Sequence, residues 1–80
     1  MTRRYRSRND IVVEILMAAL DCVRKTRIMY VAYLSYDQID KEYLPVLIKS
    51  GLLQYDKTKR TCCTTEKGKD FIEKYKSLKL

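Results

Sequence analysis

Apolar side chains recur three and four positions apart along much of the chain, the spacing that places them on one face of a helix. The first such stretch begins at Ser7, with Asp10 in its first turn, and predicts a long helix. Its expected core face is Ile11, Val12, Ile15, Leu16, Ala19, Leu20 and Val23. Val13 and Met17 add a second stripe, so this helix should be buried on more than one side.

The same spacing predicts three further helices. They are a short helix over about residues 27–33 capped by Thr26, a third helix from Ser35 to Gly51 with the stripe Ile39, Tyr43, Leu44, Leu47 and Ile48, and a C-terminal helix capped by Thr65. Ser35 and Gln38 have the spacing of a capping box. Pro45 conflicts with the middle of the third helix at a cost of about 3 kcal/mol, so a kink or a broken turn is expected between Glu42 and Leu44.

A hairpin is predicted between the third and the last helix. Residues 52–56 read as a strand, residues 57–59 as a turn and residues 60–64 as the returning strand. Leu53 and either Cys62 or Cys63 should face the helices, because an isolated hairpin is unstable. Gly68 indicates close approach of another backbone to the last helix.

Two short helices joined by a tight turn form a helix-turn-helix, and the hairpin adds a wing. The predicted fold is therefore mainly α (α+β): a winged helix-turn-helix with a three-helix core, a two-stranded β-hairpin wing and a C-terminal helix. It should occupy residues 7–80 as one domain, after a flexible basic arm over residues 1–6.

The net positive charge of the chain indicates the kind of partner it binds. The 80 residues include 17 basic and 10 acidic side chains, a net charge of +7, and Arg3, Arg4, Arg6 and Arg8 lie within the first eight positions. This balance favours a polyanion such as nucleic acid. A chain this short buries only about 60% of its unfolded surface, so it would gain from dimerisation.

The three cysteines do not form a recognisable metal motif. Cys62 and Cys63 are neighbours, which in a strand point to opposite faces, and the chain has no histidine. We expect no metal, and reduced thiols in a cytosolic protein, with Cys22 as a small core residue. A cysteine redox sensor is a minor alternative.

Other classes of protein find little support in the sequence. The longest apolar run is shorter than the roughly 18 residues of a membrane span, and the N-terminus lacks the apolar core of a signal peptide. With no histidine, no glycine-rich phosphate loop and no nucleophile near a base, we expect no enzyme activity and no cofactor.

Candidate DNA contacts fall outside the apolar stripes. They are the four arginines of the N-terminal segment, Arg27 in the second helix, Tyr36, Gln38 and Lys41 at the start of the third, and Lys57, Lys59 and Arg60 in the turn of the hairpin. Glutamine can pair with adenine in the major groove, whereas lysine and arginine suit phosphates. The alternatives are that Gln38 only caps its helix and that the basic residues are ordinary solvated side chains.

The C-terminal helix carries an apolar seam of Phe71, Ile72, Tyr75 and Leu78. Together with Val13 and Met17 of the first helix, this seam predicts a homodimer. Packing within a single chain is the alternative.

Several segments taken together resemble a known family. KTRIMY, LSYDQ, YLPVLIKSGLL and TEKGKDFIEKY, with a short hairpin before the last, are similar to the small archaeal winged helix-turn-helix proteins. The resemblance covers about residues 7–78. That group includes transcriptional regulators and the chromosome-associated winged-helix proteins of crenarchaea, which dimerise through the C-terminal helix. The resemblance implies that Tyr36, Gln38 and Lys41 lie on the recognition helix, that Lys57, Lys59 and Arg60 lie in the wing, and that Arg27 faces the DNA backbone.

The sequence therefore predicts a homodimeric transcriptional regulator that binds double-stranded DNA in the cytoplasm, associated with the nucleoid. One alternative is a protein-interaction adaptor of the transcription machinery, which the acidic residues of the third helix and the seven tyrosines favour. The other is a non-specific architectural chromatin protein.

Overall fold

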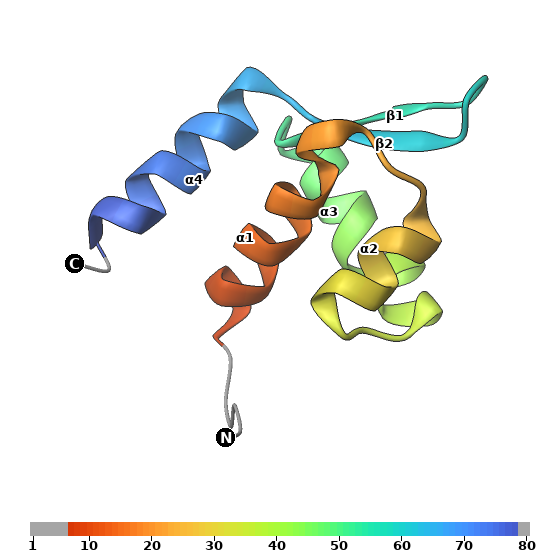
Figure 1. Cartoon of the computed structure of the whole chain (residues 1–80), viewed down its shortest axis with the longest axis horizontal. Helices are drawn as coiled ribbons and strands as arrows, with labels where there is room; N and C mark the ends of the chain where they lie inside the picture. The colour runs from red at the N-terminus through yellow and green to blue at the C-terminus, as the bar shows by residue number, and fades with distance from the viewer. Residues whose placement is uncertain (1–6, 79–80) are drawn as a thin grey trace.

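The structure, a computed structural model, describes residues 7–78. Its elements are α1 (Arg8–Ala18), the 3₁₀ turn η1 (Ala19–Asp21), α2 (Lys25–Ala32), the π-helix η2 (Gln38–Tyr43), α3 (Leu44–Lys49), β1 (Leu53–Asp56), β2 (Thr61–Thr64) and α4 (Glu66–Leu78). In Figure 1, α1 and α4 lie on the left and α2 on the right, and the hairpin passes above them with its tip on the side of α2. The predicted order of helices and hairpin is confirmed.

The first helix begins with a complete capping box. The Ser7 hydroxyl accepts from the amide of Asp10, and the Asp10 carboxylate accepts from the amide of Ser7, both at 3.0 Å. Most of its predicted core face is buried, with Val13 in addition. Leu20, predicted to be buried, is 43% exposed, because the helix tightens into η1 after Ala18 and the apolar face turns away from the core.

The second helix starts earlier than predicted. It begins at Lys25 after Arg24, whose backbone is extended and whose side chain makes no cap, so the prediction that Thr26 caps this helix is wrong. Val23 explains the early start, since its amide and carbonyl pair with Cys62 of β2 and fix the chain just before the helix. Tyr33 ends the helix in a left-handed conformation, with φ of 54°.

The third helix combines two kinds of winding. Ser35 and Gln38 form the predicted capping box, with hydrogen bonds of 3.0 and 3.1 Å. The helix then widens into η2, where the amide of Leu44 donates to the carbonyl of Ile39, five residues back. Pro45 falls at the start of α3, where a missing amide matters least. The structure has a change of winding here in place of the predicted kink or broken turn.

This change of winding shifts the buried face of the third helix. Ile39, Tyr43, Leu44 and Leu47 are buried as predicted. Ile48 is 41% exposed and not part of the core, because the wide turns of η2 add a residue to each turn and rotate the later positions.

The third helix ends as its glycine predicts. Gly51 is left-handed, with φ of 82°, and the amide of Leu52 donates to the carbonyl of Leu47. The predicted close approach at Gly68 is confirmed, since a Cβ atom there would collide with the carbonyl oxygen of Leu52 and the methyl group of Thr64. The amide of Gly68 also donates to the hydroxyl of Thr65, the predicted cap of α4.

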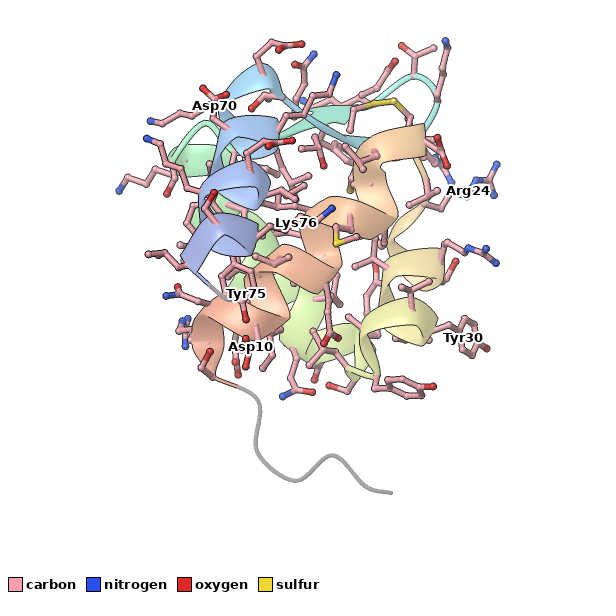
Figure 2. The ribbon with its side chains drawn as sticks, turned by 60° about the vertical axis from the view of Figure 1, so that its left-hand side comes forward. Asp10, Arg24, Tyr30, Asp70, Tyr75 and Lys76 are labelled. Carbon is pink, nitrogen blue, oxygen red and sulfur yellow. A yellow bond between two sulfur atoms is a disulfide. The ribbon has the colours of Figure 1, made fainter. Side chains whose placement is uncertain are left out.

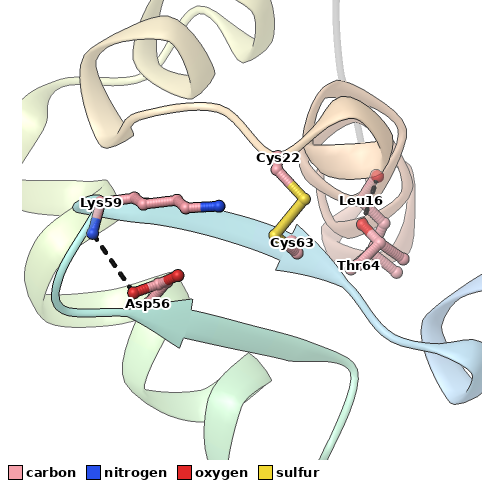
Figure 3. Close-up of a disulfide and its surroundings, with 6 residues drawn as sticks. All are labelled: Leu16, Cys22, Asp56, Lys59, Cys63 and Thr64. Atoms are coloured by element: carbon pink, nitrogen blue, oxygen red, sulfur yellow. Dashed lines mark hydrogen bonds between the residues drawn. A yellow bond between two sulfur atoms is a disulfide. The ribbon is translucent and has the colours of Figure 1, made fainter.

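The hairpin is attached to the helices along one face. Strands β1 and β2 are antiparallel, with Leu53 opposite Thr64 and Tyr55 opposite Cys62. Leu53 and Cys62 are buried, as predicted for the inward face. The buried hydroxyl of Thr64 donates to the carbonyl of Leu16 at 2.6 Å, which joins the wing to α1 (Figure 3).

The cysteines differ from their prediction. Cys22 and Cys63 form a disulfide, and Cys22 is exposed rather than a core residue (Figure 3). The prediction of three reduced thiols holds for Cys62 alone, which is free and buried. The error has a tertiary cause, because the bridge between Val23 and Cys62 brings the end of η1 alongside β2 and places the two outward cysteines next to each other.

Candidate nucleic-acid interface

A basic hollow of about 380 Å³ lies where the start of α2, the start of the third helix and the wing meet. Arg24, Lys25, Thr26, Tyr36, Tyr55 and Arg60 line it. These residues come from three separate stretches of the chain, and three of them are cationic. Its wall thus combines positive charge with two aromatic rings.

The side chain of Lys25, which lines this hollow, contacts two elements other than its own. Its Nζ lies 2.7 Å from Oδ1 of Asp40 in η2, and 5.3 and 6.0 Å from the ring centroids of Tyr55 and Tyr36. The hydrogen bond to Asp40 raises the pKa of Lys25 above its usual range, against the opposing effect of burial. Lys25 therefore holds α2, η2 and β1 together through one ammonium group.

The rim of the hollow carries the two arginines. Arg24 and Arg60 are both exposed, and the side chain of Arg24 projects away from the body of the molecule in Figure 2. Arg60 has φ of 56° in the turn of the wing, and Asp56 fixes that turn by accepting from the amides of Thr58 and Lys59 (Figure 3). The turn thus presents its basic residues while its one carboxylate is bonded to backbone.

The predicted recognition residues lie at the front of the third helix. Tyr36 is 46% exposed and reaches the hollow, and Lys41 is exposed one turn further on. Gln38 is partly buried, and its Oε1 accepts from the amide of Ser35, so pairing both amide atoms with a base would require that bond to break. The capping role is therefore present in this structure, and base contact by Gln38 stays a prediction.

The third helix has fewer unpaired carboxylates than its sequence suggests. Asp40 is paired with Lys25, whereas Asp37 and Glu42 are exposed. One of the three carboxylates that oppose phosphate is thereby neutralised.

The other predicted basic contacts are dispersed. Lys57 and Lys59 are exposed in the wing beside Arg60, and Arg27 is exposed on α2 but does not line the hollow. The guanidinium of Arg8 lies 5.1 Å from the ring centroid of Tyr43 and is engaged there. Arg3, Arg4 and Arg6 lie outside the described residues.

The predicted dimer seam is divided between core and surface. Val13 and Ile72 are buried within the single chain, at 5% and 6% exposure, and Phe71 and Tyr75 are partly buried. Met17 and Leu78 are exposed, at 44% and 85%. Only part of this set is therefore accessible to a second copy.

Four residues of the hollow are not among the contacts that the sequence predicts: Arg24, Lys25, Thr26 and Tyr55. Arg24 and Lys25 form a basic pair directly before Thr26 and Arg27, and that local density of charge was the available signal. Nothing local marks Tyr55, which joins the hollow only because β1 folds beside α2.

Residues 7–78 contain no group of three or more histidine, cysteine, aspartate or glutamate side chains arranged to hold a metal ion. No helix in this range is long and apolar enough to cross a bilayer.

The order of helices and hairpin matches a known architecture. A family model described as winged helix-turn-helix covers residues 5–80. The chain belongs to this family. No curated protein matches the chain significantly. Winged helix-turn-helix domains are typically DNA-binding and non-enzymatic, and in this one α2 and the η2–α3 helix form the helix-turn-helix, with β1 and β2 as its wing.

Proposed function

We propose that this winged helix-turn-helix protein is a transcriptional regulator that binds double-stranded DNA. The front of the third helix would enter the major groove, and the wing and the start of α2 would hold the backbone. The observation that carries the proposal is the convergence of Arg24 and Arg60 on one hollow beside the third helix.

The chemistry of the hollow suits a phosphodiester. Arginine binds phosphate through parallel N–H donors, and the first turn of α2 offers backbone amides without a side-chain cap. Tyr36 and Tyr55 give the sugar a flat surface to pack against. Such contacts would fix the position of the protein on the duplex, and Tyr36, Gln38 and Lys41 would supply contacts in the groove.

The test is duplex affinity measured by fluorescence anisotropy at two salt concentrations. The variant Arg24→Gln/Arg60→Gln should bind a random duplex about tenfold or more weakly. The slope of log affinity against log salt should become shallower by about 2, since two phosphate contacts are lost. The matched control is Lys49→Gln/Lys74→Gln, which removes the same charge from exposed positions outside the hollow and should retain the slope.

Equal losses in the two double variants would refute the assignment, since net charge alone would then explain the binding. The same titration separates a regulator from the architectural alternative. A regulator should prefer its own upstream region over a random duplex by an excess that survives added salt, whereas an architectural protein should show equal affinities that fall steeply with salt.

We propose further that the protein is a homodimer through α1 and α4, as in the archaeal group that the sequence resembles. The exposure of Met17 and Leu78 supports this seam. Met17→Lys/Leu78→Lys should shift the sedimentation coefficient towards the monomer. Val46→Lys is the control, because Val46 is an equally apolar side chain that is 52% exposed on α3. The proposed regulator would be a cytoplasmic, nucleoid-associated protein of archaeal source.

A protein-interaction adaptor is the second candidate, and the tyrosines at the corner of the helix-turn-helix favour it. Tyr30 and Tyr33 are 71% and 79% exposed, and Tyr30 projects outward in Figure 2. Aromatic side chains of this kind are enriched at protein interfaces. This function predicts weak duplex affinity that the Arg24→Gln/Arg60→Gln variant does not lower beyond its control.

A further inference from the structure

The disulfide joins the two segments that lead to the basic hollow. It joins Cys22, just after η1, to Cys63 in β2, across 41 positions of sequence and with 4.2 Å between their Cα atoms. Cys22 is exposed and Cys63 is partly buried, so a small thiol in solution can approach the bond from the side of Cys22. Figure 3 shows the bond between them. The bond is therefore a surface link between the helical core and the wing.

The two linked segments also carry the arginines of the rim. Arg24 follows Cys22 by two residues, and Arg60 precedes Cys63 by three. Val23 and Cys62, the direct neighbours of the two bonded cysteines, exchange backbone hydrogen bonds of 3.1 and 2.7 Å. The disulfide thus fixes the distance between the start of α2 and the returning strand of the wing, the two segments that place Arg24 and Arg60 at one hollow.

The third cysteine does not compete for the bond. Cys62 is fully buried on the opposite face of β2, and burial raises the pKa of its thiol, so it carries little thiolate at neutral pH. Only one pairing is therefore available in the folded protein.

We propose that Cys22 and Cys63 form a reversible thiol–disulfide site, which exchanges with low-molecular-weight thiols and sets the DNA affinity of the basic hollow. This inference rests on the proposed DNA-binding function. Exposed disulfides are the ones that exchange readily, and the position of this bond between the segments that carry Arg24 and Arg60 gives it a regulatory role.

The exchange consumes two molecules of a small thiol and produces one small-molecule disulfide. A thiolate attacks Sγ of Cys22, the Sγ–Sγ bond breaks, and Cys63 leaves as a thiolate that takes up a proton. A second thiolate attacks the mixed disulfide and releases Cys22 as a thiol. Two thiol molecules have then been oxidised to one small-molecule disulfide, and the protein disulfide has been reduced to two thiols.

Reduction should weaken DNA binding because the reduced protein is less preorganised. Without the bond, the two hydrogen bonds between Val23 and Cys62 remain the nearest link between the segments. Arg24 and Arg60 would have to be ordered relative to each other when DNA binds, which costs affinity. We expect the reduced protein to bind a duplex about threefold to tenfold more weakly.

The experiment measures affinity for a random duplex with the oxidised protein and with protein reduced by dithiothreitol. The redox-insensitive control is Cys22→Gly/Cys63→Ser, because glycine adopts the positive φ of position 22 without strain. It should bind like the reduced protein in both buffers. Circular dichroism at the assay temperature shows whether each form is folded.

A linkage measurement needs no variant. The protein is equilibrated over a series of reduced to oxidised glutathione ratios, with and without saturating duplex, and its free thiols are counted after alkylation. Bound duplex should raise the value of [GSH]²/[GSSG] at which half of the protein is reduced, by the same factor as the difference in affinity between the two forms.

Three results would overturn the inference. They are an unshifted midpoint, equal affinity of the two folded forms, and a bond that millimolar glutathione does not reduce in the folded protein. Failure of the oxidised protein to bind any duplex would instead overturn the proposed DNA-binding function.

Discussion

Within residues 7–78, three residues other than glycine adopt a left-handed backbone. Cys22, Tyr33 and Arg60 have φ of 54°, 54° and 56°, and each follows a helix or turn where the chain reverses. An L-residue pays roughly 1–2 kcal/mol for that conformation. Surrounding contacts fix it in each case: the disulfide at Cys22, the helix end at Tyr33 and the wing turn at Arg60.

Tyr33→Gly should therefore stabilise the protein. The side chain is 79% exposed, so little packing is lost, and glycine relieves the backbone strain at the end of α2. We expect the free energy of unfolding in urea to rise by about 0.5–1 kcal/mol. Tyr30→Gly, inside the same helix, is the control and should lower it by about 1 kcal/mol. A loss of stability in both variants would show that the Tyr33 ring contributes more than its exposure indicates.

Gly68→Ala should destabilise the protein. The added methyl group would meet the carbonyl oxygen of Leu52, which is backbone and cannot rotate away. We expect a loss of about 1–3 kcal/mol in the free energy of unfolding, as for other overpacked sites. Ser77→Ala on the exposed part of the same helix should be close to neutral. An unchanged unfolding midpoint for Gly68→Ala would mean that α4 is not held against Leu52 in solution.

At the scale of elements, the third helix combines two kinds of winding. Its π winding accommodates Pro45 and rotates Ile48 out of the core. The pair between Lys25 and Asp40 connects this irregular segment to α2 and so fixes the front of the helix relative to the hollow.

The stability contribution of this pair should depend on pH. The pKa of Lys25 is raised above its ordinary value of 10.5 in the folded protein, chiefly by the hydrogen bond to Asp40. The contribution is therefore fully present below pH 10.5 and is lost as the pH rises through the folded-state pKa. With both side chains partly exposed, at 27% and 34%, we expect it to be below about 1 kcal/mol.

Unfolding of the wild type and of Lys25→Met between pH 7 and pH 11 measures this contribution. The difference in unfolding free energy should shrink above pH 10.5. Lys74→Met, at an exposed position of α4, is the control and should show no such trend. A difference that stays constant over the whole range would mean that Lys25 stabilises the fold by packing alone.

At the scale of the whole molecule, the wing is a structural part of the domain. It is attached to the helices by the buried Leu53 and Cys62, by the hydrogen bond from Thr64 to Leu16, and by the disulfide. Figure 3 shows the last two links side by side on β2. The conformation of the wing is therefore coupled to the stability of the core.

Reduction of the disulfide should lower global stability. The bond closes a stretch of 41 residues, and a crosslink of that length restricts the unfolded chain enough to contribute about 2–4 kcal/mol. The urea midpoint of the wild type should fall on addition of reductant, whereas Cys22→Gly/Cys63→Ser should not respond. Coincident unfolding curves for the oxidised and reduced wild type would contradict the crosslink.

The sequence by itself determined the order of elements and most of their ends. The capping boxes at Ser7 and Ser35, the left-handed Gly51 and the cap at Thr65 depend on residues within a few positions of one another. The buried faces of the helices follow largely from spacing for the same reason. Local rules failed where winding changes, as at Leu20 and Ile48.

Tertiary structure alone decided the composition of the basic hollow and the state of the cysteines. Lys25 meets Asp40 across 15 positions, and Cys22 meets Cys63 across 41. Arg24 and Arg60 are likewise brought to one hollow only by packing of the wing against the start of α2. No periodicity along the chain encodes these pairings, because they depend on how β2 lies beside the end of η1, and that placement exists only once the core has formed.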